Sequence, residues 1–199
     1  MKNIIFGIAI SLVSFTACNN DNNKFTEDNK KNSDTAQANN MQPMNGAAND
    51  ATSKSGSSIK EVVGEYLQIK NALANDNGKD AATAGKAMVD ALSKVDKTSF
   101  TADQKKVYED AADDVKENAE HIGDNGDKID HQREHFDMLS KDLYDMVKTF
   151  GAGTTLYQDY CPMYNNKKGA TWLSETKEIK NPYLGGKMPT CGSVKEELK

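Results

Sequence analysis

The residues best suited to chemistry are sulfur side chains near the C-terminal end of the chain. Cys161-Pro162-Met163 forms one arm and Met188-Pro189-Thr190-Cys191 a second, so each arm offers one thiol and one thioether beside a proline. The proline ring fixes φ and stiffens the backbone next to these donors. Polarisable thiolate and thioether sulfur atoms are the ligands that a soft monovalent ion such as Cu(I) prefers. The pattern therefore favours binding of a soft metal ion.

The two cysteines have a second interpretation, a structural disulfide. An even pair of cysteines in a loop-rich segment of an exported chain normally pairs covalently. A bridge between Cys161 and Cys191 would close a loop of about 30 residues and stabilise the fold by roughly 3 to 4 kcal/mol on the chain-entropy model. Both interpretations stay open, and they are compatible if the bridge can be reduced.

Among the 3 histidines of the chain, His135 is the favoured metal ligand. At 100° per residue it lies on the flank of a helix whose buried face is centred on Phe136, where its imidazole could turn toward a C-terminal segment. His131 falls on a more exposed line and His121 near the end of the preceding helix, so both rank below His135. Zinc ranks below copper, because structural zinc usually takes four Cys or His ligands in tight pairs, to which His131 and His135 are only the nearest approach, and methionine is a poor zinc ligand.

The N-terminal segment predicts export and a lipid anchor. Lys2 supplies positive charge, Ile4 to Phe15 is apolar, and Thr16-Ala17 precedes Cys18. That order is typical of a secretory signal peptide, and it resembles the lipobox of bacterial lipoproteins, whose cysteine is lipidated. The apolar run of about a dozen residues is too short to cross a bilayer. We expect residues 1–17 to be the signal peptide and Cys18 to carry the lipid.

A polar segment follows the predicted lipidation site. Asn, Asp, Lys, Ser, Gln and Ala dominate it up to Ser58. Such a composition cannot bury enough apolar surface to offset the entropy of ordering the chain. We therefore expect residues 18–58 to be the lipidated cysteine and a disordered tether, and residues 59–199 to be the folded domain.

Four amphipathic helices are predicted in the first two-thirds of this domain. Apolar residues recur at spacings of three and four between about 59 and 74, 81 and 95, 102 and 122, and 127 and 150. Thr101 and Gln104 form a capping-box pattern at the start of the third helix. Short connections between such helices favour an up-down-up-down bundle. The predicted fold class is therefore all-α.

The segment after Gly153 is expected to be irregular. It contains three of the 4 prolines, both remaining cysteines and the only Trp of the chain. This density of turn residues excludes a fifth long helix. Residues 153–199 are thus predicted to be an irregular flap that contains the Cys and Met residues, with Trp172 fastening it to the bundle. Arg133, which has acidic neighbours, is predicted to make a structural ion pair.

Composition and motifs exclude several classes of protein. The chain has 30 Asp and Glu against 25 Lys and Arg, a net charge of -5 and a mean hydropathy of -0.75. Nucleic-acid binders need a concentrated excess of basic residues, so we expect no nucleic-acid partner. No Gly-rich phosphate loop, G-x-S-x-G or H-E-x-x-H motif occurs, and no base lies next to Cys161, which is followed by Pro162 and Met163. We expect neither an enzyme nor an organic substrate.

Several short motifs together resemble one family. They are Tyr66 to Leu73, Gln132-Arg133-Glu134-His135-Phe136, Leu139-Ser140, Cys161-Pro162-Met163, Trp172-Leu173-Ser174, Asn181-Pro182-Tyr183, Gly185, Met188 and Cys191-Gly192. Their order and spacing are similar to a domain-of-unknown-function family of Gram-negative bacteria. That family occurs as stand-alone lipoproteins and as a C-terminal extension of membrane-fusion subunits of copper/silver-type heavy-metal efflux systems. The resemblance covers residues 59–199.

The resemblance implies a heavy-metal site and a setting for it. Carried over by residue, the ligands would be Cys161, Met163, Met188 and Cys191 together with His135, and the efflux setting points to Cu(I). The expected protein is a lipid-anchored, periplasm-facing lipoprotein that sequesters copper or passes it to an efflux adaptor or pump. The alternative is a partner-binding module without metal, in which Cys161 and Cys191 form a structural disulfide.

Overall fold

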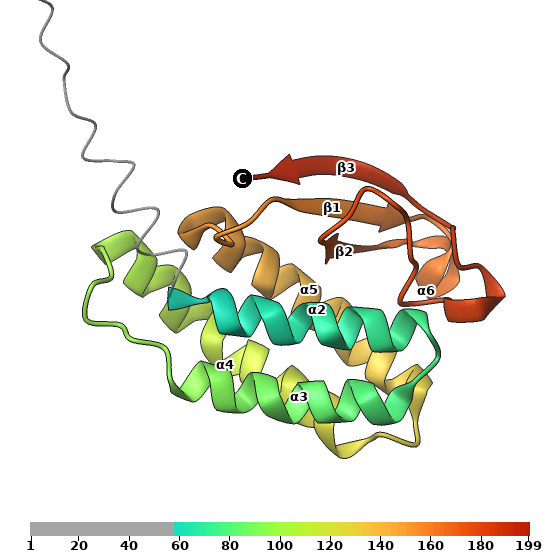
Figure 1. The fold of residues 1–199 in the computed structure, drawn as a ribbon, viewed down its shortest axis with the longest axis horizontal. Coiled ribbons are helices and arrows are strands. Elements are labelled where there is room, and N and C mark those ends of the chain that lie inside the picture. Colours follow the sequence, from blue (N-terminus) through green and yellow to red (C-terminus); the bar gives the residue numbers. More distant parts are fainter. Residues whose placement is uncertain (1–57) are drawn as a thin grey trace, which may run out of the picture. The chain divides into compact units, whose positions relative to one another are not determined.

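The computed structural model describes residues 58–199, in which four long helices are the main elements. These are α2 (Lys60–Ala74), α3 (Gly78–Ser93), α4 (Ala102–Asp124) and α5 (Ile129–Phe150). Helices that follow one another along the chain pack together, as Figure 1 shows. The four predicted helices are confirmed. None of the helices in this part of the chain is long and apolar enough to cross a membrane.

Local side-chain bonds explain where the helices begin and end. The Thr101 hydroxyl accepts a hydrogen bond from the Gln104 N–H at 3.2 Å, and the Gln104 side chain accepts one from the Thr101 N–H at 3.0 Å. This is the predicted capping box at the start of α4. Asn77 caps α3 in a related way, because its side chain accepts from the Asp80 N–H at 3.1 Å.

A glycine lets α3 and α4 approach closely. A Cβ atom on Gly85 would lie 2.8 Å from the Ala119 carbonyl oxygen and 2.9 Å from the Gly123 nitrogen. Only a residue without a side chain fits at this contact, since both distances are shorter than van der Waals contact. The close packing fixes the position of the C-terminal half of α4 against α3.

The predicted all-α fold class, with an irregular C-terminal flap, is wrong. The segment that follows α5 forms a three-stranded antiparallel sheet of β1 (Leu156–Cys161), β2 (Ala170–Ser174) and β3 (Ser193–Leu198). The strand order is β2-β1-β3, so β1 is central. The protein is therefore a mixed α/β structure, with four long helices followed by the sheet.

The prolines and glycines of this segment occur between the strands rather than within them. Pro162 and the short turn α6 (Tyr164–Lys167) connect β1 to β2, and the 3-10 turn η1 (Gly185–Lys187) lies in the connection from β2 to β3. Turn residues exclude a long helix, but they also separate strands of five or six residues. The density of prolines was therefore compatible with a sheet.

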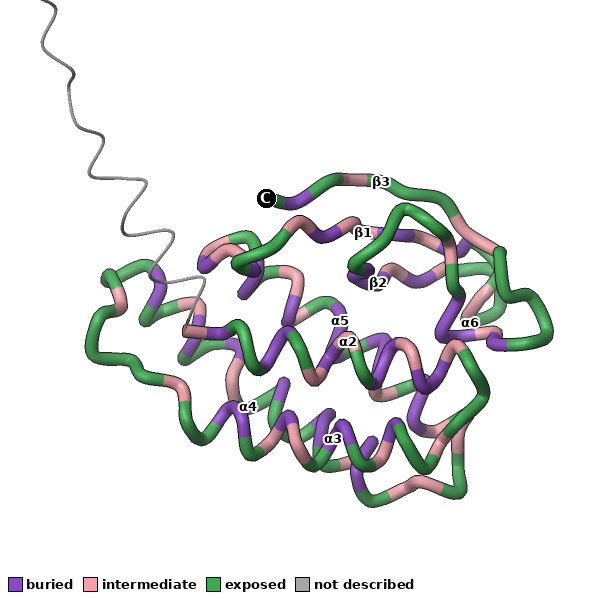
Figure 2. The backbone as a smooth tube through the Cα atoms, viewed as in Figure 1, coloured by how far each residue is buried: buried purple, intermediate pink, exposed green. Residues whose placement is uncertain are grey.

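The sheet and the helices share one hydrophobic core. β2 packs against α5 and α2, and buried residues line the inner sides of these elements in Figure 2. Tyr66 of α2 joins them: its ring stacks on Phe136 at 5.0 Å, and its hydroxyl accepts from the Leu173 N–H of β2 at 3.0 Å. Trp172 is buried in this core, as predicted.

Candidate functional site

The two cysteines meet at one end of the sheet. Cys161 is the last residue of β1 and is fully buried, while Cys191 is half-buried two residues before β3. Their sulfur atoms lie 2.6 Å apart, and both are free cysteines. A disulfide bond measures about 2.05 Å, whereas two sulfur ligands on one tetrahedral metal lie about 3.7 Å apart at a metal–sulfur distance of about 2.3 Å. The observed spacing lies between these two arrangements.

A buried asparagine holds the loop that carries Cys191. The Asn181 side chain donates to the Cys191 carbonyl oxygen at 2.6 Å, and its own carbonyl oxygen accepts from the N–H groups of Tyr183 and Leu184 at 2.8 and 2.9 Å. The Asn181 N–H donates to the Pro189 carbonyl oxygen at 2.9 Å. Because Asn181 is fully buried, these bonds fix the loop in front of β3.

The two predicted methionine ligands lie in the backbone turns beside the cysteines. Met163 follows β1 and Met188 follows η1, and their side chains are 44% and 42% exposed. The Met163 N–H bonds to the Cys191 sulfur, and the Cys191 N–H donates to the Met188 carbonyl oxygen at 3.1 Å. The structure therefore brings all four sulfur residues to one region, with the thioether side chains on the outside.

The environment favours the protonated form of Cys191. Partial burial, followed by the neighbouring Cys161 sulfur, raises the pKa of the Cys191 thiol, while the Met163 N–H lowers it. A metal ion binds the thiolate, so it would have to displace the thiol proton.

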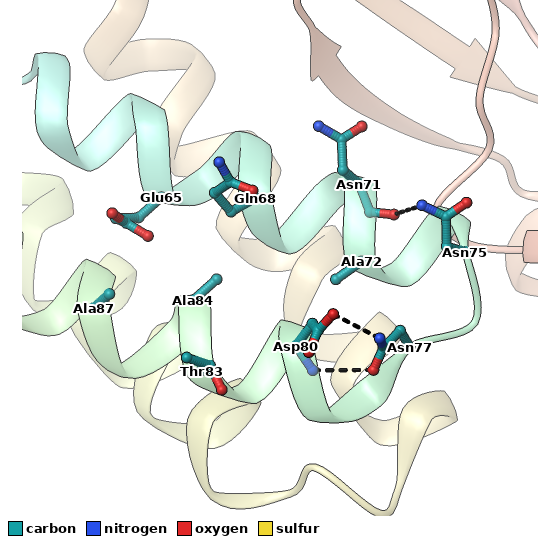
Figure 3. Close-up of a pocket in the computed structure, with 10 residues that line it drawn as sticks. All are labelled: Glu65, Gln68, Asn71, Ala72, Asn75, Asn77, Asp80, Thr83, Ala84 and Ala87. Carbon is teal, nitrogen blue, oxygen red and sulfur yellow. Dashed lines mark hydrogen bonds between the residues drawn. The ribbon is translucent and has the colours of Figure 1, made fainter.

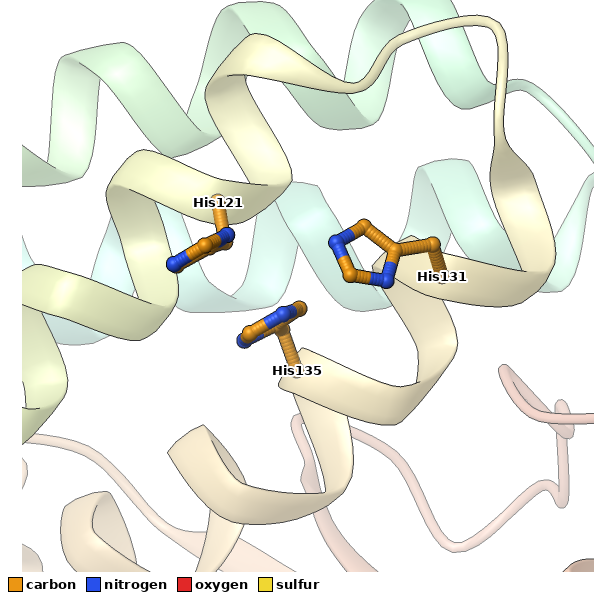
Figure 4. Close-up of side chains that lie close together, drawn as sticks. All are labelled: His121, His131 and His135. Carbon is orange, nitrogen blue, oxygen red and sulfur yellow. The ribbon is translucent and has the colours of Figure 1, made fainter.

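The structure places His135 elsewhere, in a cluster of all three histidines. The ring of His135 stacks on that of His121 at 4.1 Å with an interplanar angle of 2°, and it meets His131 edge-on at 4.5 Å. One ligand atom from each ring lies within 4.8 Å of the others. Figure 4 shows the three rings gathered between α4 and α5. His135 is thus grouped with His121 and His131.

The sequence contained part of the signal for this cluster. His131 and His135 are spaced i, i+4, which places them on one face of a helix. His121 lies ten residues before His131, across the short connection between α4 and α5. The cluster was missed because each histidine was considered alone. Antiparallel packing of α4 and α5 brings the end of α4 next to the start of α5.

A groove runs along one side of the cluster, at His135. It has a volume of about 370 Å³ and is lined by Asp114, Glu117, Asn118, His135, Met138, Lys141 and Asp142. A second groove, of about 410 Å³, lies between α2 and α3, where small and polar side chains such as Ala84 and Asn77 line it (Figure 3). No histidine or cysteine lines this second groove.

The protonation of His135 depends on its burial and on the two histidines beside it. Burial, and next the nearby His121 and His131, lower the pKa of His135. The imidazole therefore stays neutral to a lower pH than a free histidine does, and a neutral imidazole is the form that binds metal.

Comparison with known proteins finds one family similarity, in the helical part of the chain. Residues 62–155 match the model of a family described as "Protein of unknown function (DUF3347)". This agrees with the predicted resemblance to a domain of unknown function. The matched range spans α2 to α5 and includes the three histidines but ends before β1. No curated protein and no solved structure matches the chain.

Proposed function

We propose that this domain captures a soft heavy-metal ion, Cu(I), at Cys161 and Cys191. The single observation that carries this proposal is the convergence of two thiols from sequence positions 30 residues apart, with the residues Met163 and Met188 in the adjoining turns. Thiolate and thioether sulfur atoms together are a ligand set that selects Cu(I) over harder ions. His135 lies with the other histidines, so we leave it out of this set.

Binding would proceed by opening the sulfur pair. The two sulfur atoms must separate from 2.6 Å to about 3.7 Å to admit an ion between them, given metal–sulfur bonds of about 2.3 Å. Cys161 is fixed by β1 and the Asn181 bonds hold the loop of Cys191, so the movement falls on the side chain of the half-buried Cys191. The exposed thioether groups of Met163 and Met188 then offer a route by which a partner's sulfur ligands displace the ion stepwise.

An anaerobic Cu(I) competition titration tests this proposal. The reduced chain carrying Cys18→Ser should bind one Cu(I), and adding Cys161→Ser and Cys191→Ser should weaken that binding at least a hundredfold, because both thiolates are lost. Met138→Leu provides a matched control, since Met138 is an exposed methionine on α5. Affinity no better than millimolar, or equal affinity in both proteins, would contradict the proposal.

The short distance between the sulfur atoms supports a second candidate function. At 2.6 Å the thiols are poised to form a disulfide that would fasten the loop before β3 to β1. The domain would then be a partner-binding module without metal. Counting free thiols in Cys18→Ser protein isolated from an oxidising compartment without reductant separates the two functions. Two free thiols per chain favour Cu(I) capture, and none favours the fastened module.

The proposed setting is a lipid-anchored protein that faces the periplasm and passes copper to an efflux adaptor or pump. The pattern around Cys18 supports this setting, although Cys18 and the rest of residues 1–57 lie outside the described residues. We expect a bacterial host grown with labelled palmitate to label the natural chain, and Cys18→Ser to abolish the label because no acceptor thiol precedes the domain. Equal labelling of both chains would refute the anchor.

A further inference from the structure

The three histidines form a compact group of ligands with no role in the sulfur site. His121 and His131 are 44% and 38% exposed, and His135 is half-buried between them. Their ring centroids are 4.1, 4.5 and 5.9 Å apart. Like-charged imidazolium groups would repel at these distances, so the arrangement suits neutral rings. Because His121 and His135 are stacked face to face, one of the two rings must turn before both can bind a shared cation.

Two rigid elements position the three rings. His131 and His135 project from the first two turns of α5, one helical turn apart, and His121 projects from the last turn of α4. The helices pack along their lengths, with the residues 125–128 connecting them. Ligands on packed helices keep their mutual positions better than ligands on loops do.

A hydrogen bond outside the cluster fixes the tautomer of His135. The Asn118 amide nitrogen donates to the Asp114 carbonyl oxygen at 2.8 Å, so the amide oxygen is the atom that faces His135. That oxygen lies 2.9 Å from His135 Nδ1, which must therefore carry the proton and donate. Nε2 of His135 is left with its lone pair free. A second partner that orients an imidazole in this way is typical of histidine ligands to metals.

The electrostatics of the rim favour a cation. The Glu117 carboxylate lies 3.9 Å from His121 Nε2, and the Glu134 carboxylate lies 3.5 Å from His131 Nδ1. The adjoining groove adds Asp114 and Asp142 against a single Lys141. Carboxylates around an open cleft raise the local concentration of cations.

We propose that His121, His131 and His135 form a binding site for a divalent transition-metal ion of the zinc and copper(II) class. Imidazole nitrogen suits these borderline ions better than it suits Mg²⁺ or Ca²⁺. Three histidines leave a fourth tetrahedral position for water or for the Glu117 carboxylate, which lies 3.9 Å from His121 Nε2. The ligand atoms need to close from within 4.8 Å of one another to about 3.4 Å, the spacing set by metal–nitrogen bonds of about 2.05 Å. Rotation of the exposed His121 and the half-buried His131 side chains provides that change.

This site is independent of the proposed Cu(I) function, because no sulfur atom takes part. Zn²⁺ is the probe, titrated by competition with a chelator into the full chain with all three cysteines replaced by serine. The expected result is one Zn²⁺ per chain with a Kd of micromolar or below. His121→Gln should weaken binding at least tenfold, and the double variant His131→Gln/His135→Gln should reduce it below detection. Lys116→Gln, an exposed change on α4 at a residue that belongs neither to the histidine cluster nor to the groove lining, should leave it unchanged.

A second measurement separates loss of ligands from loss of fold. Saturating Zn²⁺ should raise the Tm of the cysteine-free chain by mass action, and it should not raise the Tm of the double histidine variant. Asn118→Leu should weaken Zn²⁺ binding by about 10- to 100-fold, because it removes the group that orients His135. In the same variant the ¹⁵N chemical shifts of the His135 ring should change, because the ring is no longer held in one tautomer. Millimolar affinity, or affinity unchanged by the histidine substitutions in variants that unfold cooperatively, would overturn the proposal.

Discussion

Arg133→Met is expected to destabilise the domain by about 3 to 5 kcal/mol, the cost typical of breaking a buried network of hydrogen bonds to a charged group. Arg133 is only 4% exposed. Its guanidinium donates to the Leu73 carbonyl oxygen at 3.0 Å, to the Pro182 carbonyl oxygen at 2.9 Å and to Asp76 at 2.6 Å. Methionine fills the volume of the side-chain stem but leaves the carbonyl groups without a donor. Urea unfolding monitored by circular dichroism measures the change.

The geometry around Arg133 explains why the effect should be large. Gly185 adopts φ of +49°, and a Cβ atom there would collide with the Asp76 carboxylate and approach Arg133 Nη2 to 2.6 Å. The guanidinium thus joins the end of α2, the α2–α3 turn and the loop that leads to η1. The hydrogen bond from Arg133, and next the Gly186 N–H, hold the pKa of Asp76 below its usual value. The predicted structural ion pair of Arg133 is confirmed, and it extends well beyond α5.

A matched control tests whether the loss of stability comes from the buried network of Arg133 or from the loss of any charge near it. Asp130 also faces Arg133, but at 3.5 Å and with 87% of its side chain exposed. Asp130→Asn should therefore cost less than about 1 kcal/mol, as exposed ion pairs do. If Arg133→Met costs no more than Asp130→Asn, the buried network does not stabilise the domain.

The helices could be predicted because their signals are local. The capping box of Thr101 and Gln104 and the spacing of apolar residues every three or four positions depend on neighbours along the chain. The sheet was missed because the signals that predict it are not local. β1 carries the polar Gln158 and Asp159 in its middle, with an irregular register between them. Half of the residues of β3 are charged and most of them are exposed. Neither strand shows the clean alternation that predicts a strand from sequence.

Of the two candidate sites, one depends on contacts that the sequence does not reveal and the other on helices that were predicted. The convergence of Cys161 and Cys191 depends on the pairing of β1 with β3, which sequence spacing alone does not reveal. The histidine cluster depends on the packing of α4 against α5, both of which were predicted. Folding the two predicted helices against each other would have placed His121 over the pair His131 and His135.

The second large effect concerns Asp159, a buried carboxyl group in the central strand. Asp159 is fully buried, and neither of its oxygens has a hydrogen-bond partner among residues 58–199. Burial raises its pKa to about 7, with Lys70 lowering it and Glu175 raising it further. The folded domain therefore holds a proton on Asp159 over a range of pH in which the unfolded chain has released it.

The sign of the resulting pH dependence follows from this difference. Between about pH 4 and pH 7 the folded state binds more protons at Asp159, so this group makes stability fall as pH rises. The loss reaches up to about 4 kcal/mol above pH 7, for a pKa difference of roughly three units. His135 works in the opposite direction, because its lowered pKa makes stability rise with pH as the unfolded histidine loses its proton near its ordinary pKa. Comparison with a variant isolates the Asp159 contribution.

Asp159→Asn should stabilise the domain by about 2 to 4 kcal/mol at pH 8, and it should have little effect at pH 4, where the natural carboxyl group is already protonated in the fold. Asparagine has nearly the same shape but no charge to desolvate. Urea unfolding at pH 4, 6 and 8 measures the difference, with the exposed Asp113→Asn of α4 as the control. An equal change at all three pH values would show that Asp159 is charged throughout and balanced by Lys70. In that case the interior of the sheet would hold a true ion, and the attraction of Lys70 would outweigh both burial and the repulsion of Glu175 without a retained proton.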